Sequence, residues 1–130
     1  MGYELVWEPH GLIKRLVGNV GTDDLLKMIS AVHGDGRFDD LRYIIIDTRD
    51  STGHSVPEPT LIEIAAVDEV AISTHYRFNG IQAKIAIVAT DPVMISLAEA
   101  YTHFDSSGLA QIETFSTMDD ARAWTYSPQA

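Results

Sequence analysis

The 130-residue sequence contains no cysteine, which excludes disulfide bonds, thiolate chemistry and cysteine-based zinc sites. It also lacks a long apolar run: the β-branched stretch at residues 43–46 is far shorter than the roughly 20 residues that a membrane span needs. Its first ten residues lack the basic region and apolar core of a secretory signal peptide. We therefore expect a cytoplasmic protein without a membrane span.

Positive charge is scarce as well. Nine lysines and arginines stand against 19 aspartates and glutamates, which gives a formal net charge of −10. Phosphate backbones and anionic lipid surfaces repel such a protein, so we expect no nucleic-acid partner. The charge leaves two interpretations open, solubility alone or attraction of a basic protein partner.

Recognised metal and nucleotide motifs are absent. The histidines, at positions 10, 33, 54, 75 and 103, form no H-x-x-x-H pair and no familiar spacing with carboxylates. The tight strand-to-helix turn Thr90-Asp91-Pro92 carries an acid and no glycine, which disfavours a phosphate there. We expect neither a metal nor a cofactor.

Apolar periodicity and turn signals predict alternating strands and helices. The expected strands cover residues 3–7, 12–17, 43–46, 84–89 and 112–115, and the expected helices begin near residues 22 (with Thr22 as the N-cap), 58, 92 and 117. The order β-β-α-β-α-β-α-β-α predicts an α/β protein with one mixed sheet of about five strands, an N-terminal hairpin plus parallel strands, and about four helices. We expect one domain over residues 1–126, followed by a tail at residues 127–130.

Five stretches that together cover nearly the whole chain carry a family resemblance: YELVWEPHGLIKRLVGNV, FDDLRYIIID, EIAAVDEVA, KIAIVATDP and FSTMDDARAW. They resemble the STAS-like family (sulfate transporter and anti-sigma factor antagonist domains), in an uncharacterised bacterial branch related to sporulation anti-anti-sigma factors. The resemblance implies a STAS-like fold and a role in binding or regulation. Because such folds are similar to the CRAL-TRIO lipid-transfer architecture, it also keeps a small apolar ligand open.

The resemblance further implies a position for a phosphorylated serine. In anti-anti-sigma proteins that serine follows a central strand at the start of a helix, where backbone N–H groups favour a phosphate. Asp105-Ser106-Ser107-Gly108 instead follows an expected helix, with Gly108 as its C-cap. Asp50-Ser51-Thr52-Gly53 has the required position, so Ser51 or Thr52 is the candidate phosphosite. We expect residues 48–59 to form a polar loop, and an ordinary Asx or Ser/Thr turn there is the alternative.

The same segment contains the residue types of a hydrolase. Ser51, His54 and either Asp47 or Asp50 are a nucleophile, a base and an orienting acid. They lie within one short loop, where a base is difficult to align, and no G-x-S-x-G elbow exposes the serine. We therefore expect no catalytic residues and a protein that is not an enzyme.

The expected helix at residues 58–76 is apolar nearly all round, so more than one of its faces needs covering. Asp68 and His75 interrupt this apolar surface and either satisfy local hydrogen bonds or mark the rim of a pocket or interface. The candidate ligand or interface residues on this helix are Ile64, Val67, Asp68, Ala71 and His75. A homodimer formed through the helix is the expected assembly.

These observations favour a non-catalytic STAS-like domain that binds a copy of itself, a protein partner or a small apolar ligand. An anti-anti-sigma-type regulator phosphorylated at Ser51 or Thr52 is the alternative. A small hydrolase that uses Ser51 and His54 is the competing class.

Overall fold

The computed structural model describes residues 2–80, 82–104 and 111–126, without the side chains at positions 52, 69, 72–73, 75–79 and 104. In chain order the elements are β1 (Tyr3–Glu8), β2 (Gly11–Gly21), α1 (Thr22–His33), a 3₁₀ helix η1 (Gly36–Asp40), β3 (Tyr43–Ser55), α2 (Glu58–Asn79), β4 (Lys84–Val88), α3 (Pro92–Phe104), β5 (Gln111–Phe115) and α4 (Met118–Tyr126). None of the helices in these described ranges is long and apolar enough to cross a membrane.

The strands form one mixed sheet in the spatial order β1-β2-β3-β4-β5. β1 and β2 are antiparallel, and the hairpin closes where Glu8 pairs with Gly11. The three other pairs of neighbours are parallel, as the intervening helices require. The predicted α/β class, the mixed sheet and the order of the elements are confirmed.

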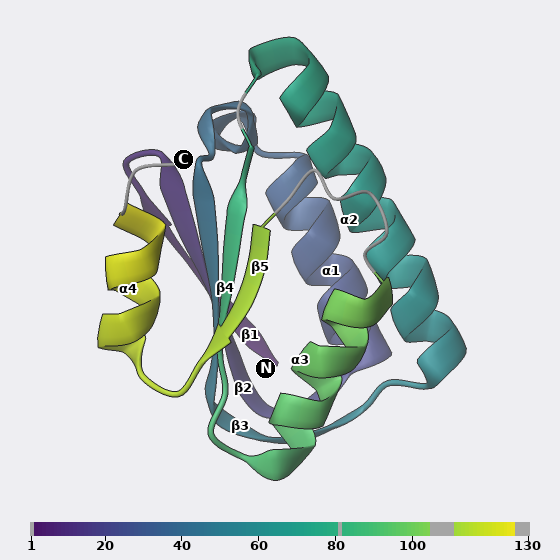
Figure 1. Cartoon of the computed structure of the whole chain (residues 1–130). Helices are drawn as coiled ribbons and strands as arrows, with labels where there is room; N and C mark the ends of the chain where they lie inside the picture. The colour runs from purple at the N-terminus through teal and green to yellow at the C-terminus, as the bar shows by residue number, and fades with distance from the viewer. Residues whose placement is uncertain (1, 81, 105–110, 127–130) are drawn as a thin grey trace.

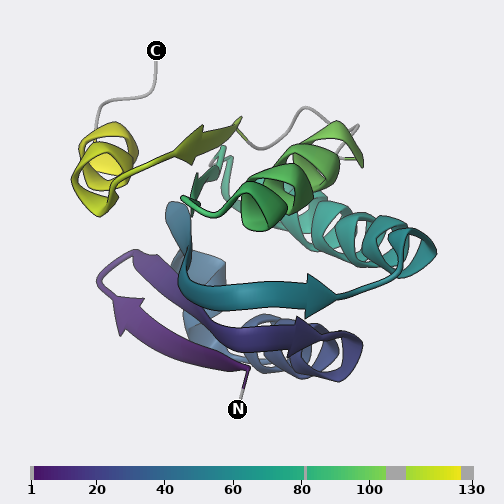
Figure 2. The same cartoon turned by 90° about the horizontal axis from the view of Figure 1, so that it is seen from below.

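Helices cover both faces of the sheet (Figures 1 and 2). α1, α2 and α3 lie on one face, and α4 lies on the other. Side chains alternate between the faces along each strand. On β2, Leu12 and Leu16 therefore belong to the core beneath the three helices, whereas Ile13 belongs to the smaller core beneath α4. Lys14 lies between Leu12 and Leu16 in this alternation and so points under the three helices.

β3 is much longer than predicted. The expected loop at residues 48–59 is wrong over its first eight positions, because β3 continues to Ser55. Most of those residues pair with β2, which has 11 residues against 13 in β3, up to Gly21 opposite Ser55, with two irregularities in the register. β4 ends at Val88, opposite Asp47, so beyond that point β3 has a neighbour on one side only. This partial cover explains why a polar sequence is tolerated in the strand.

The helix ends differ slightly from the expected ones. Gly21, not Thr22, is the N-cap of α1, and the Asp24 carboxylate accepts a hydrogen bond from the Gly21 N–H at 3.0 Å. Asp91 caps α3 by accepting from the Val93 N–H at 2.8 Å. The interpretation of residues 105–108 and the predicted tail at 127–130 both lie outside the described residues.

Candidate functional site

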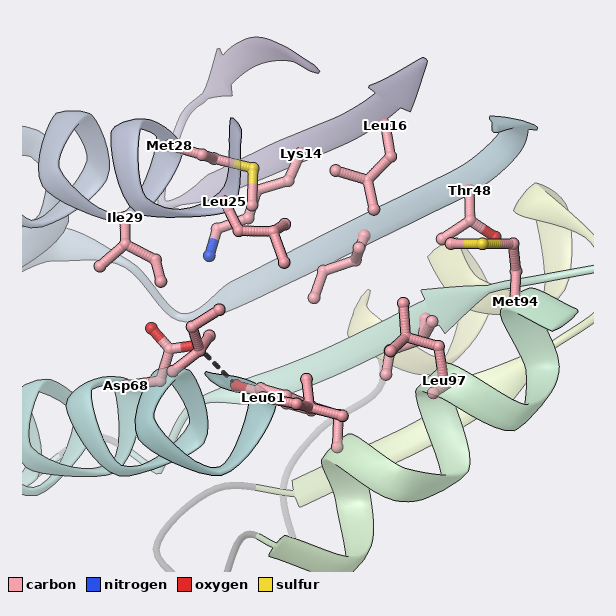
Figure 3. A pocket seen from close by; sticks show the side chains of 15 residues that line it. Lys14, Leu16, Leu25, Met28, Ile29, Thr48, Leu61, Asp68, Met94 and Leu97 are labelled. Atoms are coloured by element: carbon pink, nitrogen blue, oxygen red, sulfur yellow. Dashed lines mark hydrogen bonds between the residues drawn. The ribbon is translucent and has the colours of Figure 1, made fainter. Parts of the chain in front are cut away.

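A cavity of about 70 Å³ lies between the sheet and the three helices on its larger covered face (Figure 3). Most of the side chains around it are apolar, and they come from β2, β3, β4 and the three helices. The residues that line it are Lys14, Leu16, Leu25, Met28, Ile29, Ile46, Thr48, Leu61, Ile64, Asp68, Ile87, Met94, Leu97, Ala98 and Tyr101.

Helical periodicity brings these residues to one place. On α2, Leu61, Ile64 and Asp68 follow one another at spacings of three and four, which places them on one side of the helix. Ile64 and Leu61 are 5% and 6% exposed, so this side faces the core. Asp68 therefore lies on the core-facing side of α2, where Leu61 and Ile64 are aliphatic.

Asp68 is buried but has several polar neighbours. Its carboxylate accepts a hydrogen bond from the Tyr101 hydroxyl at 2.8 Å, and its other oxygen lies 3.4 Å from His33 Nε2. Burial is the largest influence on the pKa of Asp68 and raises it. The charge of Lys14, the hydrogen bonds from His33 and Tyr101 and the charge of His33 together outweigh burial and hold the pKa below its ordinary value. Asp68 is therefore an ionised carboxylate in the interior.

Lys14 supplies the positive charge at the same end of the cavity. Only 4% of the residue is exposed, and Figure 3 shows its nitrogen turned towards the space between α1 and α2. Among the described residues, the ammonium has no hydrogen-bond acceptor and no carboxylate within ion-pair distance. Every fully enclosed side-chain nitrogen among the described residues has a hydrogen bond. Because the Lys14 ammonium has none, it must keep some accessible surface. Lys14 is also one of the residues that line the cavity.

A second, smaller cavity continues from the polar end. Its volume is about 10 Å³, close to the minimum that holds one water molecule. Lys14, Ile46, Asp68 and Tyr101 line both cavities, and His33 lines the smaller one. The whole site is thus an apolar chamber that ends in a cluster of two basic side chains, one carboxylate and one phenol.

The structure divides the predicted helix residues between two surfaces. Ile64 and Asp68 line the cavity, whereas Val67 is 49% exposed on the outer side of α2. Ala71 is half-buried, and the side chain of His75 lies outside the described residues. Val67 does not line the cavity, and a role for it in an interface stays a prediction.

Lys14, His33 and Tyr101 were not among the predicted site residues. A signal for Lys14 was present, because a strand with Leu12 and Leu16 facing inward places Lys14 on the same inward face. His33 ends α1 and Tyr101 lies on α3, so their approach to Asp68 depends on how three helices pack. No local sequence pattern records that packing.

Ser51 lies inside β3 and not at a helix start, since α2 begins only at Glu58. It is 7% exposed, and its hydroxyl lies 2.9 Å from the Gly18 carbonyl oxygen and 3.1 Å from that of Gly53. The expected position at a helix N-terminus is thus not found. The side chain of Thr52 lies outside the described residues, and phosphorylation at either position stays a prediction.

The candidate hydrolase residues engage other partners. The hydroxyl of Ser51 lies against backbone carbonyl oxygens, and His54 Nδ1 accepts a hydrogen bond from the Val56 N–H at 3.2 Å. Asp47 binds the Arg49 guanidinium at 2.9 Å, and Asp50 pairs with Arg15. The structure does not bring these residues together as a nucleophile, base and orienting acid.

Comparison of the sequence with family models and with curated proteins finds no match. Solved structures do match. The unphosphorylated anti-sigma factor antagonist SpoIIAA has a TM-score of 0.61 at 9% identity, with 94% of this chain and 96% of that chain covered. The phosphorylated Bacillus SpoIIAA, described as a cell fate determinant, has a TM-score of 0.57 at 10% identity and covers 94% and 97%.

A further structure comes from Shewanella loihica PV-4, an uncharacterised protein of the DUF3478 family with a SpoIIAA-like fold. Its TM-score is 0.56 at 15% identity, with 95% of this chain and 91% of that chain covered. The chain therefore has the SpoIIAA-like (STAS) fold that its sequence resemblance predicts. At these identities the likeness extends to the fold alone.

Proposed function

We propose that this SpoIIAA-like domain is a non-catalytic binding domain that takes a small, mainly apolar ligand into the cavity between the sheet and α1, α2 and α3. The observation that carries the proposal is the combination of an apolar cavity with the buried Lys14 ammonium, which has no described hydrogen-bond acceptor. A pocket with mostly apolar walls and a few converging polar groups is the usual form of a ligand site.

An empty apolar cavity destabilises a protein, because the side chains around it lose contacts that a filled core provides. At roughly 24 cal/mol per Å³, the volume of about 70 Å³ corresponds to about 1.7 kcal/mol. A ligand of matching shape restores those contacts. A cavity of roughly 150 Å³ admits benzene, so this chamber takes a guest no larger than benzene.

The polar residues of the site support binding more than chemistry. Tyr101 and His33 already contact the Asp68 carboxylate, and Thr48 donates its hydroxyl proton to the Val88 carbonyl oxygen at 2.7 Å. The polar lining therefore holds few groups that remain open to a guest, and the Lys14 ammonium is one of them. Such an arrangement orients a ligand by a hydrogen bond at one end and leaves its apolar body in contact with aliphatic side chains.

Methionine methyl groups give a direct test. Met28 and Met94 line the cavity, whereas Met118 is the first residue of α4 and packs against the core on the opposite face of the sheet. Protein labelled at its methionine methyls is titrated with isobutyramide, isobutanol and isobutyrate and followed by NMR. We expect saturable shifts at Met28 and Met94 with at least one compound, and no comparable shift at Met118. If no compound moves the two cavity methyls more than Met118, the proposed function is wrong.

A further inference from the structure

We infer that the ligand of this cavity is a small organic carboxylate, held by a charge-assisted hydrogen bond from the Lys14 ammonium while its hydrocarbon part fills the apolar chamber. This inference rests on the proposed function and adds the chemical class of the ligand. It concerns the free donor of Lys14, the charges around it and the shape of the space it faces.

At the polar end of the cavity, the group with hydrogen bonds still to make is a donor, the Lys14 ammonium. Lys14 has three N–H bonds, is 4% exposed and has no acceptor among the described residues. Asp68, the nearby acceptor, already binds Tyr101 at 2.8 Å and faces His33 at 3.4 Å. The Lys14 ammonium has no acceptor among the described side chains and keeps some accessible surface, so the ligand group that complements it is an acceptor.

The local charges favour an acceptor that is itself negative. Two basic side chains, Lys14 and His33, lie at this end of the cavity, and Asp68 is the acid that lines it. A ligand carboxylate would pair with the Lys14 ammonium, whose charge no described carboxylate contacts. Hydrogen bonds between ionised partners are shorter and about twice as strong as neutral ones. A ligand ammonium would instead meet Lys14 directly and be repelled.

The acidic surface does not oppose this choice at close range. The formal net charge is −10, but exposed charges beyond about 8 Å are largely screened at physiological salt. Lys14 lines both cavities with its charge unpaired by contact, so a carboxylate that enters can bind it directly.

The space limits the hydrocarbon part. Beyond Lys14 the chamber is walled by aliphatic and methionine side chains, and its volume is about 70 Å³, roughly half that of a cavity that admits benzene. Isobutyrate has six non-hydrogen atoms, as benzene does, so it lies at the upper limit of size and fits only with its carboxylate extending from the apolar chamber to the polar end beside Lys14. A long acyl chain does not fit without movement of α2 or α3.

The test compares three ligands of nearly the same shape and different charge. Isobutyrate, isobutyramide and isobutylammonium are titrated against the full chain at pH 6.5, with the methionine methyl shifts as the readout. We expect isobutyrate to bind about tenfold or more tightly than isobutyramide, and isobutylammonium not to bind. Isobutyramide binding as tightly as isobutyrate overturns the inference and leaves the proposed function standing. Absence of binding by all three and by isobutanol overturns the proposed function itself.

Variants of two buried lysines locate the effect. Lys14→Met keeps the length and apolar body of the side chain and removes its charge, so it should weaken isobutyrate about tenfold and change isobutyramide by less than about threefold. Lys84→Met is the matched control, because Lys84 is equally buried but bonds the Trp124 carbonyl oxygen on the α4 side at 2.9 Å. Equal losses in both variants, or none in Lys14→Met, would contradict the inference. Should either variant fail to fold, the ligand series on the unaltered protein decides alone.

Discussion

Filling the cavity should stabilise the protein. Ala98 lines the chamber from α3 and is 5% exposed, and Ala98→Val adds two carbon atoms at this position. Burial of two methyl groups contributes about 1.6 kcal/mol at about 0.8 kcal/mol each. The lower helix propensity of valine removes about 0.6 kcal/mol, which leaves a net gain of about 1 kcal/mol. This gain lies within the limit of about 1.7 kcal/mol set by the cavity volume of about 70 Å³.

Urea unfolding followed by tryptophan fluorescence measures this change. With an m-value of about 2 kcal/mol per M, the midpoint should rise by about 0.5 M, and isobutyrate should no longer shift it. Ala65→Val is the matched control, since Ala65 is 3% exposed on α2 but does not line the cavity. The control should lose about 1–3 kcal/mol through overpacking. An equal loss in both variants would mean that Ala98 faces no usable space, and the reasoning from the cavity would then fail.

Three further perturbations test other parts of the structure. Asp68→Asn should lower the free energy of unfolding by about 2 kcal/mol at pH 6, because hydrogen bonds to a charged group contribute about 1.5–3 kcal/mol. The folded pKa of Asp68 lies below its unfolded value of about 3.9, so this stabilisation is present above that pH and is lost as the pH falls. The difference between the two proteins should thus shrink at pH 3 in urea titrations, and a constant difference would contradict the assignment. We also propose that the exposed Val67 and Val70 on α2 contribute to a homodimer. Sedimentation should show a smaller species for Val70→Asp and no change for Leu26→Asp, a control at an exposed apolar residue on α1. A monomeric unaltered protein would refute the dimer. Because the Ser51 hydroxyl is buried against backbone carbonyl oxygens, incubation with an anti-sigma-type kinase and ATP should leave Ser51 without phosphate by mass analysis; a phosphate mapped to Ser51 would show that β3 opens.

The covered strands were predictable from the sequence because their apolar character follows directly from burial on both sides. The runs at 44–46 and 84–88 are central strands in the structure, and Ile45 is fully buried. Cap residues likewise marked the helix starts to within a residue or two. These signals are local, and the fold class required only their order.

The end of β3 was not predictable in the same way. A polar segment is compatible with a loop and also with a strand that has a neighbour on one side only. Residues 48–55 form a strand because β2, about 35 positions earlier in the sequence, is long enough to pair with them. The site depended on packing at still longer range. Asp68 was visible as an acid on an apolar helix, but its partners Lys14, His33 and Tyr101 come from three other elements. Side-chain patterns along one helix do not contain that information.

A crystal structure of the protein grown with isobutyrate tests the central claim most directly. We expect the ligand between the sheet and α1, α2 and α3, with a carboxylate oxygen about 2.8 Å from Lys14 Nζ and its methyl groups against Met28 and Met94. An unfilled cavity at saturating isobutyrate, or isobutyrate bound elsewhere on the surface, would contradict the claim that this chamber is the binding site.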